Sequence, residues 1–314
     1  MPSVFFARSV LNSPSLSASI RFAPIVPWRL CAGGIVYTAD VGKWGSRVRT
    51  GPVYGVIFDL MGTLATFTGT REELHAAWEA GARTLHAHLA ETGITIPPDG
   101  FARQLRASTE AERRRNGGNP REISVEVVLA AMLQTFGHTL TNAQMAEATR
   151  VYLAPEIEKW EALPGAFDAV EALNTEGFRL AVVSNSPSHL FLEEVVARIG
   201  LRPFFSPVMS SALVGARKPD PRLFVFVAAE WHLDPATIVV VGDGMAVDIA
   251  GAHAAGMRGI LVHGAANPDN AALDGAETPD ATLDRIADAP VIIEQWHTAA
   301  GDDARPETGF IEDF

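Results

Sequence analysis

The chain has 314 residues, of which 47% are hydrophobic and 20% charged, a balance that excludes a wholly disordered protein and predicts about two globular domains. Its net charge of −12 argues against a nucleic-acid-binding groove. No apolar run approaches the ~18 residues of a membrane-spanning helix, and the single cysteine, Cys31, excludes a disulfide framework and a cysteine-based zinc site. We therefore expect a cytoplasmic enzyme, monomeric or homodimeric, with no nucleic-acid or membrane partner.

The first 52 residues differ in charge from the rest of the chain. They carry six basic side chains against one acid, Asp40, and show no sustained helical or strand period. An acid-poor N-terminus that contains Arg and Ser is typical of organellar transit peptides, and the alternative is an extension from a wrongly chosen start codon. We expect a poorly ordered extension over residues 1–52 and an acidic flexible tail over residues 299–314.

Short apolar runs, each followed by a polar or glycine turn and then a helical pattern, recur along the rest of the chain. They cover residues 53–58, 179–183, 237–241 and 259–262. Repeated strand–turn–helix units predict a doubly wound (Rossmann-like) parallel α/β sheet with helices on both faces. We place this core at residues 53–68 and 161–298. Ligands of such sheets bind at the carboxyl ends of the strands.

Between the first two predicted strands the chain shows helical patterns alone. Thr70 with Glu73, and Thr141 with Gln144, have the spacing of capping boxes, which predicts a helix start at each pair. The first of these helices would carry an apolar stripe made of Leu74, Trp78, Leu85 and Leu89. We expect residues 69–160 to form an all-helical cap inserted into the α/β core.

Two motifs at predicted strand ends could hold an anion. The sequence DLMGT ends the first strand, where Asp59 would lie at the ligand edge and could act as a carboxylate nucleophile. Ser184 and Asn185 close the second strand, where a hydroxyl and an amide could bind the anion's oxygens. Each motif taken singly is equally consistent with an ordinary turn.

Two further motifs supply opposite charges. Lys218, in the sequence KPDP, could neutralise both a carboxylate nucleophile and an incoming phosphate, although it could also be a solvated lysine before a helix. Asp243 and Asp248, in the sequence GDGMAVD, bracket a strand-to-helix turn and offer hard oxygen ligands for Mg²⁺. Their alternative interpretation is a helix cap followed by an acidic first turn.

In this order, and all at strand ends, the four motifs resemble those of the haloacid dehalogenase-like (HAD) hydrolase superfamily. The resemblance covers residues 53–298, and the helical insert between the first two motifs is similar to that superfamily's α-helical cap. It implies hydrolysis of a small phosphorylated substrate with Mg²⁺ as cofactor, through an aspartyl-phosphate intermediate.

The resemblance also implies a role for each matching position. Asp59 would be the nucleophile, and Lys218 would steady it together with the phosphoryl group. Phosphate binding would fall to Ser184, Asn185 and Thr63. The metal ligands would be Asp59, the backbone carbonyl of Met61, Asp243 and, often through water, Asp248.

Met61 departs from the pattern of the family's phosphatases. They usually carry a second aspartate at this position, which protonates the leaving oxygen and later activates water, a contribution of roughly 10²–10⁴-fold in rate. A thioether cannot supply it. Three hypotheses therefore stay open: a phosphatase slowed by the missing acid, a dehalogenase- or phosphonatase-like hydrolase, and a binding or regulatory protein with little catalysis.

Overall fold

The computed structural model describes residues 29–31, 34–36, 51–98, 101–116, 122–263 and 277–299. The predictions of a poorly ordered extension and of an acidic tail fall almost entirely outside these residues. Within the extension, β1 (Arg29–Cys31) and β2 (Gly34–Val36) pair antiparallel as a separate two-stranded sheet. Among the described residues, no helix combines the length and the apolar character needed to cross a membrane.

A six-stranded sheet, parallel throughout, forms the centre of the molecule and confirms the predicted fold class. Its strands, in order across the sheet, are β10 (Ala281–Leu283), β9 (Arg258–Val262), β8 (Ile238–Gly242), β3 (Gly55–Phe58), β6 (Arg179–Ser184) and β7 (Val208–Ser210). The four predicted strands are all present, with ends shifted by no more than two residues. The sequence did not indicate β7 and β10, because three residues are too few to display a period.

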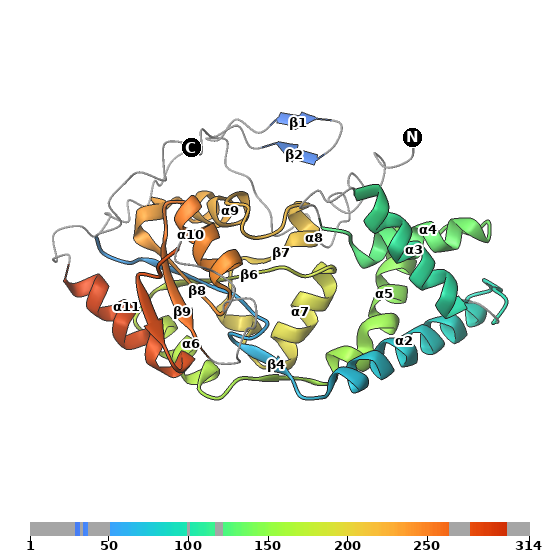
Figure 1. Cartoon of the computed structure of the whole chain (residues 1–314), viewed down its shortest axis with the longest axis horizontal. Coiled ribbons are helices and arrows are strands. Elements are labelled where there is room, and N and C mark those ends of the chain that lie inside the picture. Colours follow the sequence, from blue (N-terminus) through green and yellow to red (C-terminus); the bar gives the residue numbers. More distant parts are fainter. Residues whose placement is uncertain are drawn as a thin grey trace, which may run out of the picture.

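Helices cover both faces of the sheet because its strands are apolar on both sides. In β3, Val56 and Phe58 pack into one hydrophobic cluster, whereas Ile57 packs into the other. The first face is covered by α6 (Ala166–Thr175), α7 (His189–Arg198) and α11 (Ala289–Thr298), and the second by α9 (Arg222–Trp231) and α10 (Ala250–Ala254). Figure 1 shows these two helical layers above and below the sheet. Short 3₁₀ turns lie at Arg202–Phe204, Pro235–Thr237 and Ile286–Asp288.

A second group of helices lies between the first two strands of the sheet in sequence and beside the sheet in space (Figure 1). It consists of α2 (Arg71–Glu91), α3 (Phe101–Asn116), α4 (Val125–Thr135) and α5 (Asn142–Ile157), which we call the cap helices. Both predicted capping boxes are formed, at Thr70 and at Thr141. Leu85 and Leu89 lie in the helices' own hydrophobic cluster.

The predicted apolar stripe of α2 is wrong at Trp78, which is 41% exposed. Its indole Nε1 donates a hydrogen bond to Glu156 Oε2 at 2.7 Å, and its ring stacks on His75, so its polar edge decides its position.

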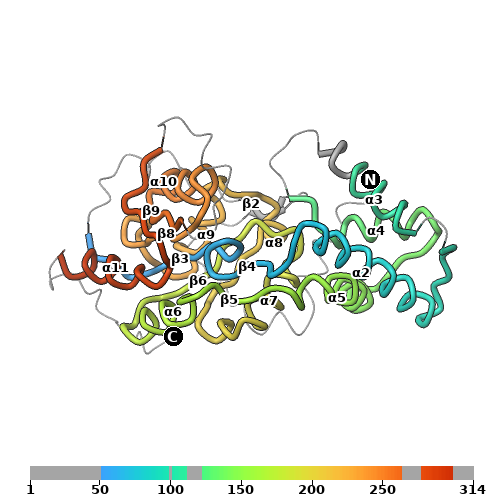
Figure 2. The backbone as a smooth tube through the Cα atoms, turned by 60° about the horizontal axis from the view of Figure 1, so that its bottom comes forward, coloured from blue at the N-terminus to red at the C-terminus, as the bar shows by residue number. Residues whose placement is uncertain are grey.

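The cap helices are joined to the sheet by a two-stranded ribbon that the sequence did not indicate. β4 (Ala65–Phe67) pairs antiparallel with β5 (Trp160–Ala162). The pairing is extended by Thr68 N–H donating to Lys159 O and Leu163 N–H donating to Leu64 O, both at 2.8 Å. Figure 2 shows the ribbon between the sheet and the α2–α5 pair. The division into core and cap at residues 68 and 161 stays our proposal.

Candidate active site

Three of the candidate side chains follow adjacent strands at the same edge of the sheet. β3 lies between β6 and β8, and Phe58 is in register with Val182 and Val241. Asp59 therefore leaves the sheet beside Ser184, the last residue of β6, and beside Asp243, which follows β8. The carboxyl edge of a parallel sheet is where its ligands bind, so the topology concentrates the polar groups where chemistry is expected.

Lys218, in the loop before α9, forms ion pairs with two of the candidate aspartates. Its ammonium is buried and donates to Asp59 Oδ1 at 2.5 Å, Asp248 Oδ1 at 2.6 Å and Val183 O at 3.0 Å. These three acceptors match the three protons of an ammonium group. The structure therefore excludes the alternative of a solvated lysine before a helix.

Burial and charge act in opposite directions on the two most deeply buried groups. Burial alone would lower the pKa of Lys218, but attraction to Asp248 and Asp59 outweighs it, and the pKa lies above its ordinary value. Burial, assisted by repulsion from Asp59, raises the pKa of Asp248 to about 6, although Lys218 opposes the rise. The lysine is therefore a permanent cation that stabilises the negative charge of this cluster.

Two glycines allow the aspartates to approach the main chain. Gly62 has φ +90°, and a Cβ there would lie 2.5 Å from Asp243 Oδ2. At Gly242 a Cβ would lie 2.4 Å from Asp248 Cγ. Asp248 Oδ2 accepts from Gly244 N–H at 2.9 Å, so both of its oxygens already have donors. These contacts explain the glycines of the first and fourth motifs as space for carboxylates.

The donor set fits a divalent metal ion. Asp59, Asp243 and Asp248 each offer one carboxylate oxygen, and these oxygens lie within 4.8 Å of one another. Opposite ligands of Mg²⁺ are about 4.2 Å apart, so a small side-chain adjustment would complete the geometry. With Lys218 the four side chains carry a net charge of −2, which a divalent cation would balance. Since both oxygens of Asp248 already have donors within the protein, a bridging water would let it support the metal without loss of either hydrogen bond.

The remaining candidates occupy different surroundings. Ser184 is fully buried, and its Oγ donates to Asp59 Oδ1 at 3.1 Å. The side chain of Asn185 closes a reciprocal pair with the peptide of Lys218: Nδ2 donates to Lys218 O at 3.2 Å and Oδ1 accepts from Lys218 N–H at 2.8 Å. Sequence reasoning missed this pair, because nothing in the sequence indicates a contact across 33 residues. Phosphate binding by Ser184 and Asn185 stays a prediction.

Thr63 and Met61, the two remaining candidates of the first motif, differ in their surroundings. Thr63 is fully buried, and its hydroxyl has no hydrogen-bond partner among the described residues, so phosphate binding there also stays a prediction. The side chain of Met61 is partly buried and packs against the hydrophobic cluster of the sheet. Its thioether offers no proton at this edge.

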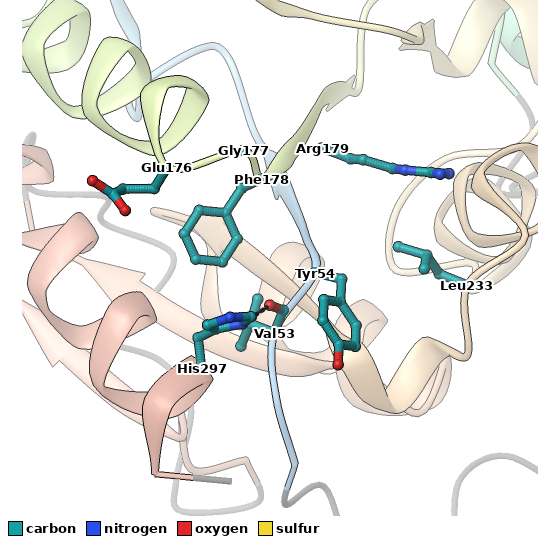
Figure 3. A pocket seen from close by; sticks show the side chains of 8 residues that line it. All are labelled: Val53, Tyr54, Glu176, Gly177, Phe178, Arg179, Leu233 and His297. Carbon is teal, nitrogen blue, oxygen red and sulfur yellow. Dashed lines mark hydrogen bonds between the residues drawn. The ribbon is translucent and has the colours of Figure 1, made fainter. Parts of the chain in front are cut away.

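A cavity of about 150 Å³ lies at the opposite edge of the sheet (Figure 3). It opens beside Tyr54 and Arg179, at the amino ends of β3 and β6. In Figure 3 the His297 ring faces Phe178 and Tyr54, and it makes edge contacts with both at 5.4 and 5.5 Å. Because β3 separates this cavity from Asp59 by about 13 Å, it is not part of the carboxylate cluster.

The comparisons with known proteins agree with this geometry. A family model described as haloacid dehalogenase-like hydrolase matches residues 54–256, which is well over half of the chain. The chain belongs to this family. It is 33% identical to haloacid dehalogenase-like hydrolase domain-containing protein 3 of Homo sapiens, over 60% of this chain and 76% of that protein.

Two further comparisons concern a curated relative and a solved structure. A phosphoglycolate phosphatase of Cereibacter sphaeroides is 30% identical over 65% of this chain and 82% of its own length. The crystal structure of a 2-haloacid dehalogenase from Pseudomonas syringae pv. Tomato superimposes with a TM-score of 0.56 at 27% identity. That similarity covers 78% of this chain and 99% of the dehalogenase chain. The protein is therefore a HAD-like hydrolase.

Proposed function

We propose that the protein hydrolyses a small phosphate ester, with Mg²⁺ as cofactor and an aspartyl-phosphate as intermediate. The observation that carries the proposal is the bonding of Asp59: Lys218 and Ser184 both donate to Oδ1, and no described side chain donates to Oδ2. The carboxylate is thus fixed in orientation with one oxygen available as nucleophile. The phosphatases among the relatives, such as the phosphoglycolate phosphatase of Cereibacter sphaeroides, support a phosphorylated small-molecule substrate.

The first half-reaction is an in-line displacement at phosphorus. Asp59 Oδ2 forms the new O–P bond while the bond from phosphorus to the ester oxygen breaks, and the alcohol departs after gaining a proton. Lys218 and Ser184 both donate to Asp59 Oδ1, which fixes the orientation of the carboxylate during the attack. Asp59 and Asp243 would hold Mg²⁺, which neutralises charge on the phosphoryl oxygens when it is bound.

The second half-reaction transfers the phosphoryl group to water. A water molecule attacks phosphorus, the bond to Asp59 breaks, inorganic phosphate leaves and the carboxylate is restored. Both half-reactions need a proton carrier near the leaving or attacking oxygen, and Met61 cannot serve. We propose that substrate, water or a cap residue supplies it and that turnover is slow for this reason.

Hydrolytic dehalogenation is the second candidate. It is favoured by Met61, since the dehalogenases of this family also lack an aspartate at that position, and by the similarity to the Pseudomonas syringae enzyme. Asp243 argues against it. Dehalogenases of this family need no metal and typically lack this acid, whereas here one of its carboxylate oxygens lies within 4.8 Å of one of Asp59, close enough for both to hold one ion.

One screen separates these candidates. Phosphate release from a panel of phosphate esters is measured with Mg²⁺ and with EDTA, and halide release from 2-haloacids is measured without metal, each with wild type and Asp59→Asn. We expect phosphate release that needs both Mg²⁺ and Asp59. Halide release that needs Asp59 alone would establish the dehalogenase, and phosphate binding without turnover in either assay would establish a binding protein.

A further inference from the structure

A segment of the cap docks on the core at a place remote in sequence from the β4–β5 ribbon. It comprises residues 122–126, which lead into α4, and we call it the docking segment. The main-chain N–H of Val125 donates to Pro187 O at 2.8 Å, and Glu126 Oε1 accepts from Ser188 Oγ at 2.9 Å. Val125 N–H is one of the donors at a helix start that lack a partner within the helix, and here the core supplies the acceptor.

Glu122 is the charged residue of this segment. Its Oε2 accepts from Ser211 Oγ at 2.5 Å and from the guanidinium of Arg217, and its side chain is only 6% exposed. Ser211 begins the short helix α8 (Ser211–Val214), which lies on the side of the core that faces α3 and α4 in Figure 1. A carboxylate is buried at low cost only when it is paired, so the segment docks where Ser211 and Arg217 are both in place.

The core residues that the segment touches lie in the two loops of the candidate site or beside them: Ser211 is in α8, and its Oγ lies 3.1 Å from Ser186 O in the loop after β6. Pro187 and Ser188 come two and three residues after Asn185, and Arg217 immediately precedes Lys218. The two loops are bonded to each other as well, through the reciprocal pair of Asn185 with the peptide of Lys218. One cap segment therefore contacts both loops, through Pro187 and Ser188 in the first and Arg217 in the second.

We propose that Glu122 is a positioning residue that holds the loop after β6 and the loop before α9 in the arrangement that binds phosphate. Docking of the cap segment and binding of an anion at Ser184 and Lys218 are then coupled, and each strengthens the other by the same factor. The choice of phosphate as the anion rests on the proposed function. Glu122 touches no reacting atom; it acts through Ser211 and Arg217.

The test measures docking and anion binding separately from turnover. Hydrogen exchange of the Val125 amide reports docking, and calorimetry with inorganic phosphate and Mg²⁺ reports anion binding. The variants are Glu122→Ala, which removes the acceptor, and Glu122→Gln, which keeps an acceptor without the charge. Arg150→Gln is the matched control, since it breaks another ion pair between cap and core, to Glu194 at 3.0 Å, that touches neither loop.

For Glu122→Ala we expect Val125 exchange to accelerate about tenfold or more, as loss of a charge-assisted hydrogen bond predicts. Phosphate affinity should fall about fivefold or more. Glu122→Gln should lie between Glu122→Ala and wild type, and Arg150→Gln should match wild type in both measurements. Added phosphate should slow Val125 exchange in wild type but not in Glu122→Ala.

Unchanged Val125 exchange in Glu122→Ala would overturn the proposal, as would faster exchange with unchanged phosphate affinity. Arg150→Gln would also overturn the proposal if it changed Val125 exchange and phosphate affinity as much as Glu122→Ala does, because loss of any contact between cap and core would then have the same effect. If the wild-type protein binds no phosphate, the proposed coupling between docking and phosphate binding does not exist and the proposal is wrong. If wild type binds phosphate with the expected coupling but hydrolyses no ester, the positioning role stands and the proposed function alone fails.

Discussion

Removal of the buried ammonium of Lys218 is the most decisive perturbation of this site. In Lys218→Met a side chain of similar length loses its charge, while Asp59 and Asp248 keep theirs. The side chains of Lys218, Asp59 and Asp248 are 2%, 7% and 1% exposed, so the two carboxylates would face each other without solvent. Breaking a buried ion pair by removing one partner typically costs about 3–5 kcal/mol of stability.

We therefore expect Lys218→Met to lower the free energy of unfolding by about 3–5 kcal/mol at pH 7 in EDTA and to abolish turnover. Lys218 opposes the rise that burial causes in the pKa of Asp248, so without the lysine that pKa lies still higher in the folded state. The unfolded state then binds fewer protons than the folded state, so the loss should shrink as the pH falls. Saturating Mg²⁺ should restore part of the stability, because a bound cation replaces the missing charge.

Urea denaturation followed by far-UV circular dichroism, at pH 5 and pH 7, with EDTA and with Mg²⁺, measures these changes. Lys159→Met is the control: its ammonium lies 3.5 Å from Glu73, and both side chains are at least 41% exposed. Such a pair contributes about 0–1 kcal/mol. A loss below about 1 kcal/mol in Lys218→Met, or equal losses at both pH values, would refute the argument that a buried charge cluster depends on this lysine.

Four other substitutions test the site and the cap. Met61→Asp should raise phosphate release by at most about 10²–10⁴-fold on a panel of esters at fixed Mg²⁺, and no rise would favour the non-phosphatase hypotheses. Asp243→Asn should weaken Mg²⁺ binding in calorimetry more than Asp248→Asn, whose oxygens both have donors within the protein; the reverse order would contradict the ligand assignment. Burial raises the pKa of Glu156 in the folded protein, and the hydrogen bond that Trp78 donates only partly opposes this rise. Ionisation of Glu156 therefore lowers the stability of the fold as the pH rises above the ordinary pKa of a glutamate. Glu156→Gln should thus be more stable than wild type at pH 7 but not at pH 4, by urea denaturation, and an equal difference at both pH values would contradict this cause.

The sequence by itself determined the fold class and the placement of Asp59 and Asp243 at one edge of the sheet. Strands buried on both faces, such as β3 and β8, are continuous apolar runs, and Asp59 and Asp243 follow those runs directly. Parallel strands place their carboxyl ends at one edge, so these residues had to come together. The capping boxes at Thr70 and Thr141 are equally local, since each is completed within four residues.

Only the tertiary structure decided how these residues are bonded. The three acceptors of Lys218 come from the residue after β3, from β6 and from the short π-helix Met245–Ile249 after β8, and no local pattern records such a set. The β4–β5 ribbon is invisible in the sequence for the same reason: its partners lie about a hundred residues apart. Glu122 carries no motif, and its burial depends on Ser211 and Arg217, 89 and 95 residues away. Long-range pairing of charges has no periodicity, so it becomes predictable only once the backbone has brought the partners together.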